Sequence, residues 1–264
     1  MTRSLSVAFS FILFGFSAAN SLLSPANNAT LLNRAASLSS GCGTSGSLSC
    51  STSASGQDLC CFESPGGLLV QPQFWDFNPS TGPSNSWTIH GLWPDHCDST
   101  FDQSCDPSRA YTGIASLLTN NGASDTLSFM QTHWVDINGD NEGFWEHEWS
   151  KHGTCMSTLE LDCFSDITKG QEAVAYFQTV VALYKVRLRV ELLVMADYFD
   201  GQTLPTYDWL ANQGITPSST ATYSLSKVLA ALKTESGGFT PALDCDGGSL
   251  NQIYWYFNLR GSGR

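Results

Sequence analysis

The chain has 264 residues, which is long enough to bury a sizeable core in one large domain or two small ones. Its formal net charge of −12 argues against a stable complex with nucleic acid, because phosphate binding normally shows as a basic surface. The objection weakens at acid pH, where histidines with a reference pKa of about 6.5 become cationic and carboxylates begin to protonate. A local positive site would then be enough for transient binding of nucleic acid.

The first 19 residues have the pattern of a secretory signal peptide. Arg3 supplies a positive charge, residues 7–16 are mostly apolar, and small residues at 17–19 suit a cleavage site. The apolar run is too short to span a bilayer, and no later stretch is long and apolar enough to be a membrane helix. We therefore expect export, no membrane association and a flexible mature N-terminus over residues 20–41. Asn28 lies in the only glycosylation sequon.

Interspersed strand and helix patterns follow, without the regular alternation of a parallel α/β fold, so the predicted fold class is α+β. Cap and turn residues indicate where one helix begins and ends: it begins at Asp106-Pro107 and ends at Asn121-Gly122. The predicted strands cover residues 68–77, 86–92, 240–244 and 252–259, and the predicted helices cover 106–120, 125–133, 142–152, 169–184, 206–211 and 225–234.

Nine cysteines agree with export, because in an oxidising compartment they predict a disulfide framework. A zinc site is the alternative, but the chain contains no CxxC pair. Nine is an odd number, so one thiol must lack an internal partner. The cysteines are Cys42, Cys50, Cys60, Cys61, Cys97, Cys105, Cys155, Cys163 and Cys245.

A first motif, WTIHGLWP at residues 87–94, carries a histidine at the end of a strand-like segment. His90 leads into a predicted loop in which Gly91 lets backbone or substrate approach closely. Taken alone, His90 would more often be a buried structural histidine. Trp93 could pack in the core or offer a face on which a base stacks. Asp95 could cap the turn or accept a hydrogen bond from a base edge.

A second motif, FWEHEWSKHGTC at residues 144–155, predicts a helix with titratable groups on one side. At about 100° per residue, Glu148, Lys151, His147 and His152 point into a single arc. A solvated helix face with an i,i+3 Glu–Lys pair is the alternative interpretation.

Aromatic residues around this cluster argue against a freely exposed helix, since Phe144, Trp145 and Trp149 all lie within it. A zinc site of the HExxH kind is not expected, because His152 lies five positions after His147, whereas the motif places its histidines four positions apart. The lysine between them would also repel a cation. Two imidazoles can instead exchange a proton as acid and base, while a lysine and a glutamate stabilise a charged phosphorane.

Both motifs resemble those of the ribonuclease T2 family of secreted acid ribonucleases, most closely its fungal members. The likeness rests on WTIHGLWPDHC at 87–97, FWEHEWSKHGTC at 144–155 and the spacing of the first eight cysteines, and it covers residues 42–185 and 203–260. It implies a catalytic domain over residues 42–264, with a central antiparallel sheet flanked by helices and stabilised by disulfides. It also implies a monomer that needs neither metal nor cofactor.

The activity implied is that of a secreted endoribonuclease that cleaves single-stranded RNA by transesterification. Products would be 2′,3′-cyclic phosphates, later hydrolysed to 3′-phosphates, with low base specificity. By resemblance, His152 is the base and His90 the acid of the first step, and the roles reverse in the second. Glu148 and Lys151 would stabilise the phosphorane, and His147 would bind phosphate.

Four more residues resemble substrate-binding positions of the family. Trp93, Asp95 and Phe101 correspond to the first base site, and Phe144 to the second. Fungal relatives often have a tyrosine where Phe101 stands, so this chain would stack a base there without the hydroxyl group.

Family pairing implies four disulfides and one exception. Cys245 normally pairs with a cysteine in a C-terminal segment, so we expect a free thiol and a chain truncated at Arg264. Residues 186–202 are an atypical insertion, for which a retained intron and a genuine surface insertion are the alternatives. The implied disulfides are Cys42–Cys61, Cys50–Cys97, Cys60–Cys163 and Cys105–Cys155.

Two other functions remain open on the sequence. A secreted, disulfide-rich binding or toxin-like protein could keep this scaffold without turnover, although intact histidines, glutamate and lysine argue against it. A phosphate-ester hydrolase would differ in metal dependence and in activity on DNA. Export leads to the extracellular space or to a vacuole-like or lysosome-like compartment.

Overall fold

In the computed structural model, three predicted segments lie outside the described residues: the signal peptide at 1–19, the N-terminus at 20–41 and the insertion at 186–202. Within the described part of the chain, no helix is long and apolar enough to cross a membrane. The described residues are 42, 46–76, 79–165, 168–185, 206–218 and 220–261.

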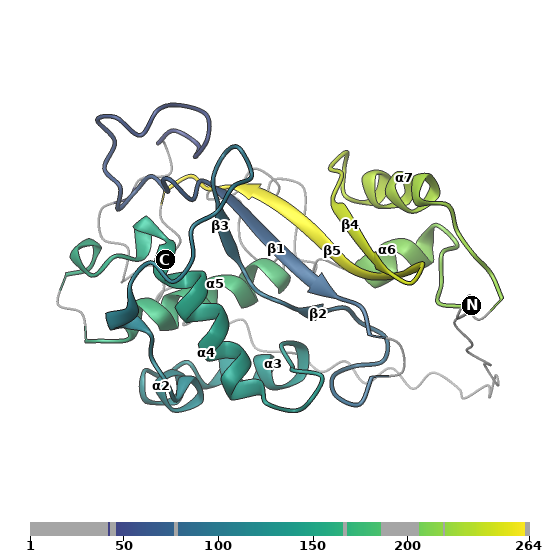
Figure 1. The fold of residues 1–264 in the computed structure, drawn as a ribbon, viewed down its shortest axis with the longest axis horizontal. Helices are drawn as coiled ribbons and strands as arrows, with labels where there is room; N and C mark the ends of the chain where they lie inside the picture. Colours follow the sequence, from purple (N-terminus) through teal and green to yellow (C-terminus); the bar gives the residue numbers. More distant parts are fainter. Residues whose placement is uncertain are drawn as a thin grey trace, which may run out of the picture.

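An antiparallel sheet forms the centre of the fold, as the family resemblance implies (Figure 1). Strand β1 (Leu68–Phe74) pairs with the long strand β5 (Ser249–Asn258), and β5 pairs in turn with β4 (Ala242–Asp246). On its other side β1 pairs with two short strands, β2 (Thr88–Ile89) and β3 (Trp93–Asp95). Segments nearly two hundred residues apart therefore lie side by side.

The two faces of this sheet have different partners, because successive side chains of a strand point to opposite faces. One face packs against helices: Gln71 on β1 donates from Nε2 to the carbonyl oxygen of Val180, at 3.0 Å. We call the opposite one the site face. It carries Val70, Pro72 and Phe74 of β1, their cross-strand partners Tyr256, Tyr254 and Gln252 of β5, and Trp93 of β3.

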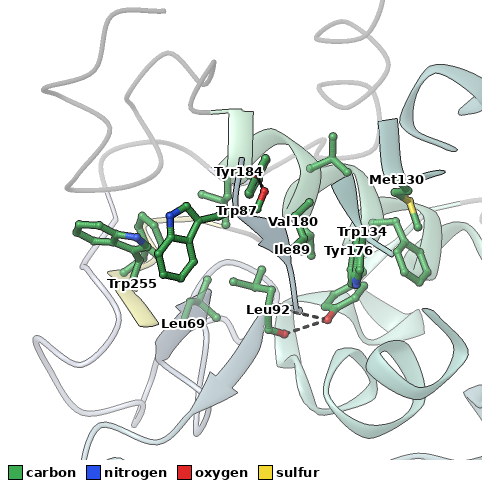
Figure 2. Packing of buried hydrophobic residues seen from close by; sticks show 14 of the residues in the cluster. Leu69, Trp87, Ile89, Leu92, Met130, Trp134, Tyr176, Val180, Tyr184 and Trp255 are labelled. Atoms are coloured by element: carbon green, nitrogen blue, oxygen red, sulfur yellow. Dashed lines mark hydrogen bonds between the residues drawn. The ribbon is translucent and has the colours of Figure 1, made fainter. Parts of the chain in front are cut away.

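Helix α5 (Gln171–Lys185) fills the core behind the sheet (Figure 2). The hydroxyl of Tyr176 accepts a hydrogen bond from the backbone N–H of Leu92 at 3.3 Å and donates to its carbonyl at 3.0 Å. About two turns further along α5, the hydroxyl of Tyr184 donates a hydrogen bond to the carbonyl of Trp87. These bonds fix the backbone on both sides of His90.

Two further helices, α6 and α7, lie beside the edge of the sheet that β4 forms (Figure 1). The T-shaped contact of Trp209 with Trp255, at 5.5 Å between ring centroids, joins α6 to β5. The other helices precede α5 in the chain. The bounds are α2 (Ile114–Asn120), α3 (Ser124–His133), α4 (Asn141–Lys151), α6 (Thr206–Asn212) and α7 (Leu225–Glu235), with short 3-10 helices at Pro107–Arg109, Gly153–Cys155, Ser157–Leu159 and Leu161–Cys163.

Two local predictions were wrong. The helix predicted over residues 106–120 is a 3-10 turn followed by α2, and Gly113, with φ of 74° in the left-handed region, separates them. The strand predicted over 86–92 is reduced to β2, while Trp93–Asp95, predicted as loop, forms β3. This strand forms because it pairs with β1, and its three residues carry no alternation of apolar and polar side chains that would predict it.

Four disulfides link the same cysteines that the family resemblance implies. They join Cys42 to Cys61, Cys50 to Cys97, Cys60 to Cys163 and Cys105 to Cys155. The loops that they close span 19, 47, 103 and 50 residues, and closing such loops stabilises a fold by restricting the unfolded chain. Cys245 is free and exposed on β4.

Candidate active site

His90 follows β2 and lies against the site face. Its backbone N–H donates to the carbonyl of Pro72 at 3.0 Å, which continues the pairing with β1. Its imidazole stacks on Phe74, with ring centroids 4.2 Å apart and an interplanar angle of 19°. The edge of Trp93 closes a second side, at 4.9 Å and 84°. The sheet thus fixes both the backbone and the ring plane of this histidine.

Glu148 of α4 is fully buried beside His90. Its Oε2 accepts a hydrogen bond of 3.0 Å from Nε1 of Trp93, and its Oε1 lies 3.5 Å from Nε2 of His90. Burial raises the pKa of Glu148, but the contact and charge of His90, the charge of His152 and the indole of Trp93 outweigh it and hold the pKa below its ordinary value. The site therefore contains a buried, ionised carboxylate.

His152 caps the C-terminal end of α4 and is also buried. Its ring stacks on Trp93 at 4.9 Å with an interplanar angle of 20°. Burial lowers the pKa of His152 to about 4; the charge of Glu148 opposes this shift and that of Lys151 adds to it. The ring is therefore neutral at mildly acid pH, the state in which an imidazole accepts a proton.

The four titratable residues predicted to share one arc of α4 have different environments. His147 is largely exposed, and its Nε2 lies 3.9 Å from Oε1 of Glu148. Lys151 is partly exposed at the last turn, where its carbonyl accepts from the N–H of Ser104 at 2.8 Å. Trp149, which the 100° spacing per residue places outside this arc, is buried in the core. The arc thus runs from solvent at His147 to the buried carboxylate.

Phe144 lies in the first turn of the same helix, and its side chain reaches the site face. Its ring lies 5.8 Å from that of His90 and 6.4 Å from that of Phe74. The three rings form an aromatic wall beside the imidazole. A base bound there would meet partly exposed apolar surface.

Asp95 and Phe101 lie together at the other end of β3, where they form an antiparallel bridge. The ring of Phe101 is 56% exposed, so it is free to stack on a ligand. Burial raises the pKa of Asp95 to about 6 against the opposing charge of His96. The turn between them is capped by Asp98, which accepts from the N–H of Thr100 at 3.0 Å.

Two residues that contact His90 escaped sequence reasoning. Phe74 stacks on the ring, and Oε1 of Gln252 lies 3.1 Å from its Nδ1. Tyr254, also on β5, places its ring 6.1 Å from that of Trp93. Only the register of β5 on β1 brings these side chains to the site, and that register is invisible in either strand alone.

Proton transfer is the chemistry that this arrangement suits, since two imidazoles flank one buried carboxylate. Among the residues that the structure describes, no group of three or more His, Cys, Asp or Glu side chains is placed to hold a metal ion. At the solvent edge of this cluster His147 is largely exposed and Lys151 is partly exposed.

The chain is similar to several known ribonucleases. Ribonuclease Le2 of Lentinula edodes is 57% identical over 228 residues, which cover 85% of this chain and 87% of that protein. Ribonuclease Trv of Hypocrea rufa is 49% identical over 215 residues, covering 81% and 84%. The crystal structure of Actibind, a T2 ribonuclease, matches with a TM-score of 0.74 at 45% identity and covers 84% of this chain and 86% of that one.

Residues 66–262 match the ribonuclease T2 family as a whole. The matched range begins just before β1 and extends past the end of β5, so it contains every strand of the sheet and both motifs. The fold agrees with that match. The chain belongs to the ribonuclease T2 family.

Proposed function

We propose that this chain is an endoribonuclease that cleaves single-stranded RNA through a 2′,3′-cyclic phosphate to 3′-phosphate ends. The observation that carries the proposal is the ionised, buried Glu148 between His90 and His152, with Trp93 in contact with all three. This set can take up a proton, deliver another and stabilise charge. No metal ion is required for any of these tasks.

In the first step His152, neutral at mildly acid pH, removes the proton of the 2′-hydroxyl. The 2′-oxygen attacks phosphorus, and the bond from phosphorus to the 5′-oxygen breaks. His90 gives its Nε2 proton to the leaving 5′-oxygen. Lys151 and Glu148 stabilise the pentacoordinate phosphorane, and His147 binds a phosphate oxygen at the solvent edge.

The second step hydrolyses the cyclic phosphate with the roles reversed. His90 now takes a proton from water at Nε2, the water oxygen attacks phosphorus, and His152 returns a proton to the departing 2′-oxygen. Each acid or base contributes roughly 10²–10⁴-fold in rate. Both steps use the same two imidazoles, so loss of either one slows both steps.

Base recognition falls to the exposed Phe101 and to two half-buried aromatic residues. Phe101 and Trp93 offer stacking faces, Asp95 offers a carboxyl group to a base edge, and Phe144 contacts the neighbouring base. Stacking tolerates every base because each has a π-face, which is why we propose low base specificity.

The decisive experiment compares the parent with His152→Ala on single-stranded RNA at about pH 5 in EDTA. Cyclic phosphate ends from the parent alone would support the two-histidine mechanism without metal. His133→Gln, a histidine of α3 outside the site, is the matched control and should cleave like the parent. Folded parent that binds RNA without cleaving it would favour the binding protein, and cleavage of DNA or loss of activity in EDTA would favour a metal-dependent hydrolase.

We also propose that the protein is exported after cleavage near Ala19 and acts as a monomer outside the cell, or in a vacuole-like or lysosome-like compartment. The signal peptide pattern and the four disulfides support export. N-terminal sequencing of the protein recovered from culture medium tests the cleavage. Light scattering of the purified protein tests the oligomeric state.

A further inference from the structure

Gln252 contacts the one edge of His90 that faces away from the proposed chemistry. It stands opposite Phe74 in the register of β5 on β1, so both side chains project from the site face. Phe74 holds the plane of the imidazole, and Oε1 of Gln252 lies 3.1 Å from Nδ1. Nε2 of the same ring lies 3.5 Å from Oε1 of Glu148. The ring is therefore held between two acceptors, one at each nitrogen.

These two acceptors compete for the single proton of a neutral imidazole. A carbonyl oxygen can only accept, so the contact with Gln252 requires the proton on Nδ1 and leaves the lone pair on Nε2. The ionised Glu148 attracts the proton to Nε2 instead, which would leave no lone pair where the substrate binds. In the imidazolium both nitrogens carry protons, and the competition disappears.

We infer that Gln252 is a positioning residue that holds neutral His90 as the Nδ1–H tautomer and so equips it for hydrolysis of the cyclic phosphate. The inference rests on the proposed function. It concerns mainly the second step, because the first step uses the imidazolium, whose Nε2 proton passes to the 5′-oxygen whatever stands at Nδ1. In the second step Nε2 must accept a proton from water while water oxygen bonds to phosphorus and the 2′-oxygen leaves.

The neutral amide suits this task because it supplies an acceptor without adding another negative charge. Glu148 already provides one carboxylate beside the ring, and Asp244, opposite Gln252 on β4, provides another one strand further away. The carboxylate of Asp244 is engaged locally, since its Oδ1 accepts from the N–H of Cys245 at 2.9 Å. In this cross-strand row Phe74 therefore contacts the face of the ring, and Gln252 is the polar group that contacts its Nδ1.

The test separates the two steps with two substrates. A dinucleoside monophosphate reports transesterification, and uridine 2′,3′-cyclic phosphate reports hydrolysis. For Gln252→Leu we expect kcat for hydrolysis to fall by roughly 10²-fold while kcat for transesterification falls less than tenfold, with KM unchanged for both. Cyclic phosphate ends should accumulate in RNA digests.

Two variants control for indirect effects. Gln252→Glu keeps an acceptor of the same length but adds a negative charge, so it should hydrolyse the cyclic phosphate faster than Gln252→Leu and more slowly than the parent. Asp244→Asn changes the neighbouring position of the same row and should leave the ratio of the two rates at the parental value. If Gln252→Leu lowers both rates equally, or if Gln252→Glu hydrolyses as poorly as Gln252→Leu, the tautomer role is refuted.

A direct readout does not depend on activity. Nitrogen-15 spectra of the imidazoles, assigned with a His90→Asn variant, distinguish a protonated Nδ1 from a protonated Nε2 in neutral His90. We expect protonated Nδ1 in the parent and protonated Nε2 in Gln252→Leu; protonated Nε2 in the parent would overturn the inference. Folded parent without RNA cleavage would instead refute the proposed function, and the spectra would still decide the tautomer.

Discussion

Gly91 and Glu148 lie so close that a β-carbon built on Gly91 would stand 2.0 Å from Oε2 of the carboxylate. This β-carbon would also lie 3.0 Å from Nε1 of Trp93, the group that donates a hydrogen bond to Oε2 of Glu148. Gly91 does not have a positive φ, so the requirement for glycine is steric rather than conformational. The residue after His90 is what lets the buried carboxylate reach the imidazole.

Gly91→Ala should therefore displace Glu148 and break its bond with Trp93. We expect RNA cleavage to fall by roughly 10²-fold or more, as when one group that stabilises the transition state is lost. The measurement is kcat on a dinucleoside monophosphate, with circular dichroism to establish folding. Gly46→Ala is the matched control, since no atom lies within 4 Å of a β-carbon there, and its activity should equal that of the parent. Full activity of Gly91→Ala would contradict the role assigned to the carboxylate.

The pKa of His152, lowered to about 4 chiefly by burial, sets the acid side of the activity profile. Only the neutral ring accepts the proton of the 2′-hydroxyl. As the pH falls through about 4 the ring becomes charged, and kcat/KM for RNA cleavage should decrease about tenfold per pH unit below that value. A pH series from 3 to 7 on the folded protein checks this, and an acid limb near pH 6.5 would show that burial does not act as described.

The same shift makes stability depend on pH. Between about 4 and 6.5 the unfolded chain protonates this histidine while the folded protein keeps it neutral, so the unfolded state binds more protons. The free energy of unfolding should therefore decrease as the pH falls from about 6.5 to about 4, by at most about 3 kcal/mol from this group. Urea denaturation at several pH values measures it, and His152→Gln should show a shallower decrease. An equal slope in the variant would assign the effect to other groups.

Sequence patterns predicted the parts of the fold that depend on local periodicity. Helix α4 and strand β5 lie within a few residues of the predicted ranges. Each segment carries a local pattern in its own sequence, helical periodicity in α4 and alternation of buried and exposed residues in β5. β3 was missed because three residues carry no periodicity and become a strand only by pairing with β1. The helix wheel placed Glu148 correctly among the titratable residues, but it could not show that this carboxylate is buried against Trp93.

The contacts of His90 could not be predicted from local sequence patterns either. Its partners Phe74 and Gln252 are separated by most of the chain, and the β1–β5 register alone joins them. Long-range pairing of this kind is fixed by the whole core rather than by either segment. The motifs therefore contain the groups that we propose for the chemistry, while the structure adds the residues that contact them.

Phe101 offers a final test, because its ring is 56% exposed and contributes little to the core. Phe101→Ala should leave the free energy of unfolding nearly unchanged and weaken substrate binding by roughly 1–3 kcal/mol, the value of one stacked base. Inhibition by a nucleoside monophosphate, measured for parent and variant, gives this difference without the chemical step. Leu225→Ala, equally exposed at 58% on α7, is the matched control and should bind like the parent. Unchanged binding by Phe101→Ala would remove this residue from the base site and leave Trp93 and Asp95 as the proposed recognition groups.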